Sequence, residues 1–221
     1  MKKVIKKLIS RYPRLKTLRI RVVNSFSNND KTKKYDISNT VILRKLKIKD
    51  MGKGNKIIIN DDSKLINCSF AFYGNNNTVA IGKNCSLNNM TVWIEDDDNK
   101  VTIGDGTTIH GETNFACIEG TQIEIGNDCM FSSYVYFRTG DSHSIVSMQG
   151  NRINHSKDIH IGNHVWVGQN VFVGKGSFVS DNSVIGAHAV VTKCFDTPNI
   201  AIAGNPAKLI KEEINWKRER V

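Results

Sequence analysis

Histidine is the side chain best suited to proton transfer near neutral pH, and this chain of 221 residues has six. His143 stands apart because it follows Gly140, Asp141 and Ser142, where the regular apolar pattern of the chain stops. A histidine on an irregular segment of a rigid fold is open to ligands, so we expect His143 to act as a general base. Asp141 is the acid beside it in sequence and a candidate to orient the imidazole, although alternating side chains can point apart.

Other kinds of site fit the residue types less well. A serine nucleophile would need a supporting motif, and no GxSxG elbow surrounds the serines beside His143. Three further histidines, His160, His164 and His188, are enough in number for a zinc site, but two of them fall on different sides of one repeat. We therefore expect no metal. Trp166 alternates with valines and should point outward, toward a ligand or a neighbouring subunit.

The elements that position these residues follow from an internal repeat. From residue 55 to 143 apolar residues recur 22 positions apart, in three series that lie six residues apart within each repeat. The first series is Ile59, Ile81, Ile103 and Ile125; the second is Leu65, Leu87, Ile109 and Phe131; the third is Trp93, Phe115 and Phe137, with Ala71 as a weak first member. Spacing of this kind predicts coils of three short strands with extra residues at one corner.

From Ile161 the period tightens to six, through Val167, Val173, Val179, Ile185 and Val191. Gly and Asn residues follow these positions, and we expect them to form corners because they tolerate positive φ. The fold class is therefore all-β, a triangular parallel β-helix. Residues 138–160 break the pattern and form a loop excursion, while a short helix around Leu209–Glu213 is expected as a C-terminal cap.

Charge separates the N-terminus from the rest. Residues 1–50 hold 16 Lys and Arg against three Asp, although the whole chain has a net charge of only +10. We expect a basic helix within residues 1–20 that packs over one end of the fold or contacts an anionic membrane surface, rather than nucleic acid. The chain then divides into a basic segment (1–34), the β-helix (35–194) and a cap with tail (195–221). Without an apolar run of membrane-span length or a secretory signal, a cytoplasmic location is expected, with peripheral contact at the inner membrane face.

Three motifs resemble those of the hexapeptide-repeat acyltransferases: DIHIGNHVWVGQN (158–170), VIGAHAVVTK (184–193) and IAGNPAK (202–208). With RTGDSHSI (138–145), the resemblance narrows to bacterial enzymes that O-acetylate sugars of capsules, lipopolysaccharide or polysialic acid. The resemblance implies a left-handed β-helix, acetyl-CoA as the acyl donor and a homotrimer with active sites between subunits. It also implies a saccharide acceptor.

Residue by residue, the resemblance assigns the general base to His143 and the facing aromatic to Trp166. It assigns the CoA arm to Gly168, Gln169, Ala187, Thr192 and Lys193. It places the acceptor sugar near Glu112 and Asn114.

The expected function is thus an acetyl-CoA-dependent O-acetyltransferase acting on a sugar hydroxyl of a bacterial surface polysaccharide or its precursor. Two alternatives stay open: a zinc enzyme of the carbonic anhydrase type on the same solenoid, and a solenoid that binds a glycan without catalysis.

Overall fold

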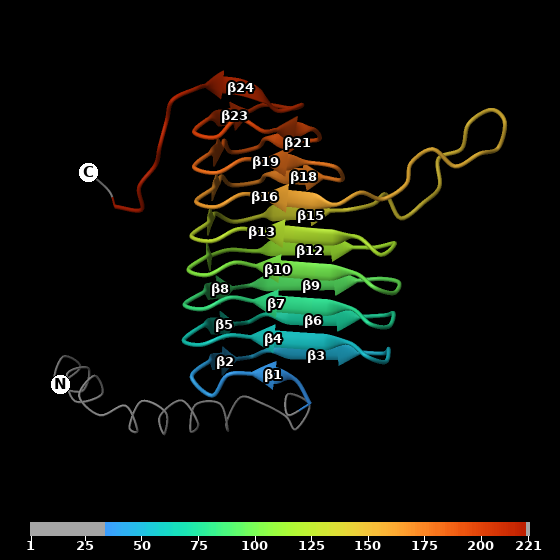
Figure 1. Cartoon of the computed structure of the whole chain (residues 1–221), viewed down its shortest axis with the longest axis vertical. Helices are drawn as coiled ribbons and strands as arrows, with labels where there is room; N and C mark the ends of the chain where they lie inside the picture. The colour runs from blue at the N-terminus through green and yellow to red at the C-terminus, as the bar shows by residue number, and fades with distance from the viewer. Residues whose placement is uncertain (1–33, 220–221) are drawn as a thin grey trace.

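The computed structural model describes residues 34–219, and its regular elements within that range are all short β-strands. The strands stack into a tall solenoid whose coils rise from β1 to β23, as Figure 1 shows. The expected basic helix within residues 1–20 lies outside the described residues. Within residues 34–219, no helix long and apolar enough to cross a membrane is present.

Three parallel sheets form the sides of the solenoid. Sheet A contains β1 (Asp36–Ile37), β4 (Lys56–Ile59), β7 (Thr78–Ile81), β10 (Lys100–Ile103), β13 (Gln122–Ile125), β16 (Ile159–Ile161), β19 (Phe178–Val179) and β22 (Cys194–Phe195). Sheet B contains β2 (Ile42–Arg44), β5 (Lys64–Ile66), β8 (Ser86–Asn88), β11 (Thr108–Ile109), β14 (Met130–Phe131), β17 (Trp166–Val167), β20 (Val184–Ile185) and β23 (Ala201–Ala203), and ends with the antiparallel β24 (Lys208–Lys211). Sheet C contains β3 (Lys47–Asp50), β6 (Ser69–Phe72), β9 (Met90–Ile94), β12 (Thr113–Cys117), β15 (Val135–Arg138), β18 (Phe172–Gly174) and β21 (Val190–Val191). Each coil runs through sheets A, B and C in turn, so its corners are named A–B, B–C and C–A.

The strand register confirms the predicted coil lengths. Ile81 of β7 pairs with Ile103 of β10, an offset of 22. Across the excursion Ile125 pairs with Ile161, an offset of 36, and Ile161 pairs with Val179, an offset of 18. The six-spaced series after residue 160 is fully buried in the core, at 0% exposure for Ile161, Val167, Val173, Val179, Ile185 and Val191.

The third predicted apolar series is wrong in its first half. Ala71 and Trp93 face outward, and their inward neighbours Phe70 and Val92 stack on Phe115 instead. The cause is one additional residue at the B–C corner between β11 and β12, which makes the offset 23 where Val92 pairs with Phe115. A single-residue shift exchanges the two faces of a strand.

The corners use Gly and Asn for two different reasons. Asn170 and Asn182 do have positive φ, of 57° and 56°. Gly168, in contrast, has an ordinary φ, and a Cβ added there would lie 2.6 Å from the backbone nitrogen of Ala187 in the next coil. Positive φ therefore does not explain this glycine as predicted, and close stacking of successive coils does.

Buried asparagines hold the long C–A corners of the 22-residue coils. The Asn77 side chain accepts a hydrogen bond from the Asn99 backbone N–H (2.8 Å), and Asn99 in turn accepts one from Thr121 N–H (3.0 Å). The Asn99 amide also donates to the Glu95 carbonyl at 2.7 Å. Both asparagines are at most 1% exposed. This ladder satisfies corner backbone groups that would otherwise be buried without partners.

The excursion is a hairpin-like finger, residues 139–158, that projects from the C–A corner between β15 and β16 (Figure 1). Val146 and Arg152 form an antiparallel bridge within it, and Ile153 N–H donates to the Ile145 carbonyl at 2.9 Å. Met148, near its tip, is 99% exposed. The finger therefore has backbone order of its own but leaves apolar side chains uncovered.

The expected C-terminal helix is wrong, because the segment forms β24 instead. Leu209 of β24 pairs with Ile202 of β23 in antiparallel orientation. A helix of about one turn would leave most of its backbone groups unpaired, whereas the edge of sheet B offers a row of partners.

After β24 the chain forms a strap, residues 212–219, that descends along sheet B. Trp216 is 6% exposed and stacks on His164, with ring centroids 4.1 Å apart. Arg218 donates to the Asp128 carboxylate (2.9 Å) and to the Thr108 hydroxyl (2.7 Å). The strap thus ties the last coil to coils well below it.

Candidate active site

Asn154 fixes the base of the finger and with it the backbone of His143. Its side-chain amide donates to the His143 carbonyl at 2.7 Å and to the Asp141 carboxylate at 2.8 Å, while its side-chain oxygen accepts from Ile145 N–H at 2.7 Å. Asn154 is only 7% exposed, so these bonds lie away from water. The His143 side chain is exposed on this anchored backbone.

Asp141 binds Lys175 rather than His143. Its carboxylate accepts from the Lys175 ammonium and from Asn154, and these contacts, Lys175 first, lower its pKa. Lys175 also donates to the Asn154 carbonyl at 2.9 Å. Asp141 therefore ties the finger to the next coil, and within residues 34–219 its carboxylate binds Lys175 and Asn154 and forms no hydrogen bond with the His143 ring.

Trp166 points outward from β17 on sheet B, as predicted, with 38% of its surface exposed. Its ring lies 6.3 Å from that of Trp216 in the strap. Sheet B is the side of the triangular coil opposite the C–A corner, from which the finger carries His143. One chain therefore does not bring His143 and Trp166 together.

The residues assigned to the CoA arm lie at two corners. Gly168, Gln169 and Ala187 share the B–C corner, where Gln169 of one coil accepts a backbone bond from His188 of the next at 2.8 Å. Thr192 and Lys193 lie exposed at the C–A corner, in line with the finger base. Lys193 places its ammonium 5.1 Å from the Phe195 ring. The two groups flank the short strands of sheet C.

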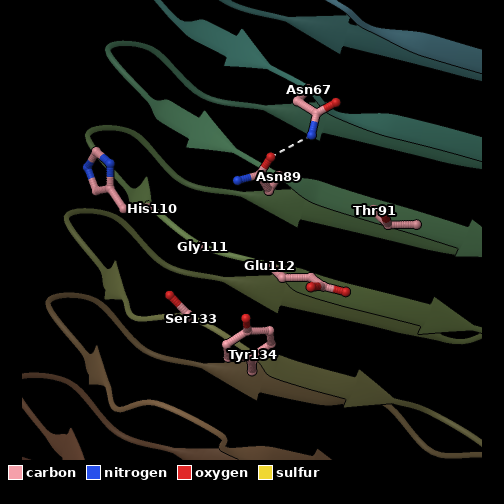
Figure 2. A pocket seen from close by; sticks show the side chains of 8 residues that line it. All are labelled: Asn67, Asn89, Thr91, His110, Gly111, Glu112, Ser133 and Tyr134. Atoms are coloured by element: carbon pink, nitrogen blue, oxygen red, sulfur yellow. Dashed lines mark hydrogen bonds between the residues drawn. The ribbon is translucent and has the colours of Figure 1, made fainter.

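A polar pocket of about 410 Å³ opens at the B–C corners of coils that precede the coil of Gln169, and Figure 2 shows its lining. Its lining residues are Asn67, Asn89, Thr91, His110, Gly111, Glu112, Ser133 and Tyr134. Figure 2 shows that they come from successive coils, with the amides of Asn67 and Asn89 joined by a 2.6 Å hydrogen bond. The carbonyl of Ser133 accepts from Asn170 N–H at 3.0 Å, so the pocket adjoins the corner of Gly168 and Gln169.

Of the two predicted acceptor residues, Glu112 lines this pocket and Asn114 does not. Asn114 lies beyond Glu112 on the outward face of β12, paired with Thr91 and Tyr136. Sequence reasoning missed His110 and Tyr134, as well as Lys175 and Asn154. The lengthened corner at residues 110–112 was the available signal for the pocket, but it appears only once strand register is known.

The other histidines have separate partners. His160 binds Glu124 at 3.0 Å on sheet A, His164 binds Asp128 at 2.7 Å at an A–B corner, and His188 contacts Asn170 at 3.2 Å at a B–C corner. They face three different sides of the solenoid. Within residues 34–219, no three His, Cys, Asp or Glu side chains are grouped to hold a metal ion.

Known proteins resemble this chain along most of its length, although no protein-family model matches it. A polysialic acid O-acetyltransferase of Neisseria meningitidis is 40% identical over 185 residues, which are 83% of this chain and 85% of the relative. A polysialic acid O-acetyltransferase of Escherichia coli O1:K1 is 46% identical over 98 residues, which are 43% of this chain and 31% of the relative.

Solved structures agree with these relatives. The crystal structure of the polysialic acid O-acetyltransferase OatWY is 34% identical with a TM-score of 0.73, covering 85% of this chain and 88% of that chain. The polySia-specific acetyltransferase NeuO is 33% identical with a TM-score of 0.63, covering 79% and 89%. The family and enzyme class indicated by the sequence motifs are confirmed. The chain belongs to the hexapeptide-repeat acetyltransferases, in the family of the polysialic acid O-acetyltransferases, and its fold is their left-handed parallel β-helix.

Proposed function

We propose that this protein transfers an acetyl group from acetyl-CoA to a sugar hydroxyl of an acidic surface polysaccharide, with polysialic acid as the first acceptor to test. The observation that carries this proposal is the 40% identity to a polysialic acid O-acetyltransferase across 85% of that relative's length. The exposed imidazole on an anchored finger and the polar pocket supply the kinds of groups that such a reaction uses.

In the proposed reaction His143 is the general base. A sugar hydroxyl is too weakly acidic to attack a thioester unaided, so the neutral imidazole removes its proton as the oxygen bonds to the acetyl carbonyl carbon. The carbon–sulfur bond of the tetrahedral intermediate then breaks, and the imidazolium returns its proton to the leaving CoA thiolate. The bonds from Asn154 to the His143 carbonyl and to Asp141 support this role, because they limit the movement of the base.

We further propose that the complete site forms between subunits of a homotrimer. Sheet B of one chain carries Trp166, while the finger leaves the opposite corner, so His143 of one subunit would reach Trp166 only on another. The uncovered apolar side chains of the finger, Ile145, Val146, Met148 and Ile153, favour contact with a second chain. Mass measurement of the protein in solution tests this, and an active monomer would contradict it.

The donor proposal follows the two corners that flank sheet C. CoA would contact Gly168, Gln169 and Ala187 at the B–C corner of one chain. It would also contact Thr192 and Lys193 at the C–A corner, where the Lys193 ammonium would lie near the negative charges of CoA. The acceptor would bind at Glu112 and Asn114. Because the pocket adjoins Gln169 through the Ser133–Asn170 bond, donor and acceptor lie side by side in this arrangement.

The deciding experiment mixes purified protein with acetyl-CoA and polysialic acid. Release of CoA thiol and the mass of the product are measured together. We expect O-acetylated polymer, and a loss of at least about a hundredfold in kcat for His143→Ala. His155→Ala is the matched control, because His155 is also an exposed histidine of the finger. His110→Ala tests the rival assignment, because His110 lines the pocket whereas His143 does not. If acetyl transfer is lost in His110→Ala and retained in His143→Ala, His143 is not the general base.

Location and the basic N-terminus form a separate part of the proposal. Residues 1–34 would hold the enzyme at the anionic inner face of the membrane, near lipid-linked glycan. A protein lacking these residues should keep its turnover on a small soluble sugar and lose binding to vesicles that contain anionic lipid. Loss of turnover on the soluble sugar would instead make the segment part of the site.

A further inference from the structure

The outward face of sheet C carries an aromatic side chain that no role above explains. Trp93 of β9 is 39% exposed on the outward face, where polar and charged side chains are more common. Its indole N–H donates to the Glu95 carboxylate at 2.8 Å, and its ring packs against Tyr73 with centroids 4.6 Å apart. The ring is therefore held in one orientation with part of its surface open.

The strand register places Trp93 at the centre of a column. Ala71 pairs with it from β6 and Ala116 from β12, so a methyl group lies on either side of the indole. One strand further, Lys49 of β3 pairs with Ala71, and Arg138 of β15 pairs with Ala116. The column, called the sheet C lane below, thus reads cation, small, indole, small, cation.

The two cations are available for a ligand. Both side chains are exposed, and within residues 34–219 neither forms an ion pair with a carboxylate. Lys49 donates to the Tyr73 hydroxyl at 3.1 Å and lies 4.5 Å from its ring, which holds the ammonium in place without neutralising it. Four strand spacings of about 4.8 Å separate Lys49 from Arg138, about 19 Å in all.

The lane also leads to the proposed catalytic groups. Arg138 is the last residue of β15, and the finger with His143 begins directly after it. On the other side, Thr91 lies two residues before Trp93 on the same face of β9 and lines the polar pocket. The lane is therefore continuous with the proposed acceptor site.

We infer that the sheet C lane binds several units of an acidic polysaccharide along the axis of the solenoid. The apolar face of a sugar ring stacks on Trp93, the alanines leave room for the rings on either side, and Lys49 and Arg138 bind sugar carboxylates. A length of about 19 Å exceeds one sugar ring, so the lane selects a polymer over a free sugar. This inference rests on the proposed function in taking the acceptor to be an acidic glycan.

Direct binding tests the lane without depending on acetyl transfer. Affinity for an oligomer of about ten sialic acids and for free sialic acid is measured by calorimetry on the full chain. Trp93→Ala should weaken oligomer binding about threefold to tenfold. Phe178→Ala is the control, because Phe178 is an outward aromatic stacked on His160 of sheet A. Equal affinities of wild type and Trp93→Ala for the oligomer would overturn the inference.

A second pair of variants avoids loss of the aromatic packing. Ala116→Glu places a carboxylate in the lane between the indole and Arg138, and should reduce oligomer binding as much as Trp93→Ala does. Ala80→Glu makes the same change on the outward face of sheet A and should have no effect. If Ala116→Glu and Ala80→Glu bind the oligomer with equal affinity, the sheet C lane is not its binding site.

The two proposals fail in different ways. If the oligomer binds through Trp93 but is never acetylated, the lane stands and the proposed reaction fails. If the oligomer is acetylated with the same KM in wild type and Trp93→Ala, the reaction stands and the lane fails. A higher oligomer KM in Trp93→Ala, with an unchanged KM for acetyl-CoA, supports both.

Discussion

The N-terminal half of the solenoid, up to β15, and the C-terminal half, from β16, follow the same coil in different sizes. In the first, the 22-residue coils give sheet C strands of up to five residues, as in β9 and β12. In the second, the 18-residue coils reduce these strands to three residues in β18 and two in β21. In the first half both outward columns of sheet C carry side chains, whereas the position of β18 that pairs with Arg138 is Gly174, which has none. Under the two proposals above, the wide half would bind the polymer, and the closely stacked corners of the narrow half would bind the acyl donor.

The two halves also close their C–A corners differently. The long corners are held from inside by Asn77 and Asn99, whose side-chain oxygens accept from backbone N–H groups of the next coil, and by Thr121, whose hydroxyl bonds to that of Thr139. The short corners close mainly by direct backbone bonds, such as the one from Gly176 N–H to the Asp158 carbonyl at 2.9 Å. Coil length therefore sets which side chains must be buried, and the finger lies where one scheme replaces the other.

The largest effect is expected from a charge in the narrow core. Val173→Asp buries a carboxylate at a position with 0% exposure, which should cost several kcal/mol and unfold the protein or its C-terminal half. Val190→Asp is the control, because Val190 is partly exposed on the outward face of β21. Thermal melting separates them, and an unchanged melting temperature for Val173→Asp would contradict the inward series.

A smaller loss is expected from the asparagine ladder. Asn99→Ala removes the acceptor of Thr121 N–H and a donor to the Glu95 carbonyl, both inside the corner, at a cost on the order of 1–3 kcal/mol. Hydrogen exchange should then rise in β10 and β13 and stay unchanged in β18 and β21. Equal exchange in both halves would mean that the ladder does not stabilise the wide coils specifically.

Lys193→Ala tests the donor side of the comparison. Loss of its charge should raise the KM for acetyl-CoA about fivefold to tenfold and leave kcat and the acceptor KM near wild type, since uniform binding is lost. Lys211→Ala is the control, as an exposed lysine on β24 away from sheet C. Steady-state kinetics with each substrate varied in turn measures both KM values. A rise in the acceptor KM instead of the acetyl-CoA KM would contradict the assignment of Lys193 to the donor.

The smallest effect concerns the joint between the halves. The contact with Lys175, followed by that with Asn154, lowers the pKa of Asp141 below its usual value of 3.8. The stabilisation that the ionised Asp141 gives the folded protein through these contacts is therefore present above pH 3.8 and is lost as the pH falls through the lowered pKa. Lys175→Met should move this loss to higher pH, though only slightly because both side chains are partly exposed. Hydrogen exchange of the Ile145 amide between pH 3 and 6 measures this shift. Identical exchange profiles in wild type and Lys175→Met would show that the contact between Asp141 and Lys175 does not anchor the finger.

Periodicity predicted the core because inward residues such as Val173 and Ile185 recur at a strict interval. The same reasoning misassigned Trp93, because an apolar residue at the right offset looks inward until a one-residue insertion in a later corner is known. Lys175 and Asn154 could not be predicted from spacing, since they meet Asp141 only through the fold of the finger. The helix expected around Leu209–Glu213 is wrong because sequence does not reveal the free edge of sheet B, with which this segment pairs.

The strap (residues 212–219) changes how such a stack of coils unfolds. In a solenoid each coil contacts only its neighbours, so the terminal coil can open first and the rest follow one by one. Here Ile214 N–H binds the Asn199 carbonyl in the last coil, and Arg218 binds Thr108 on β11, four strands lower in sheet B. Opening of the last coil must therefore break the contacts of Arg218 near the middle of the solenoid. The strap thus joins the last coil and the coils beneath it into a single cooperative unit.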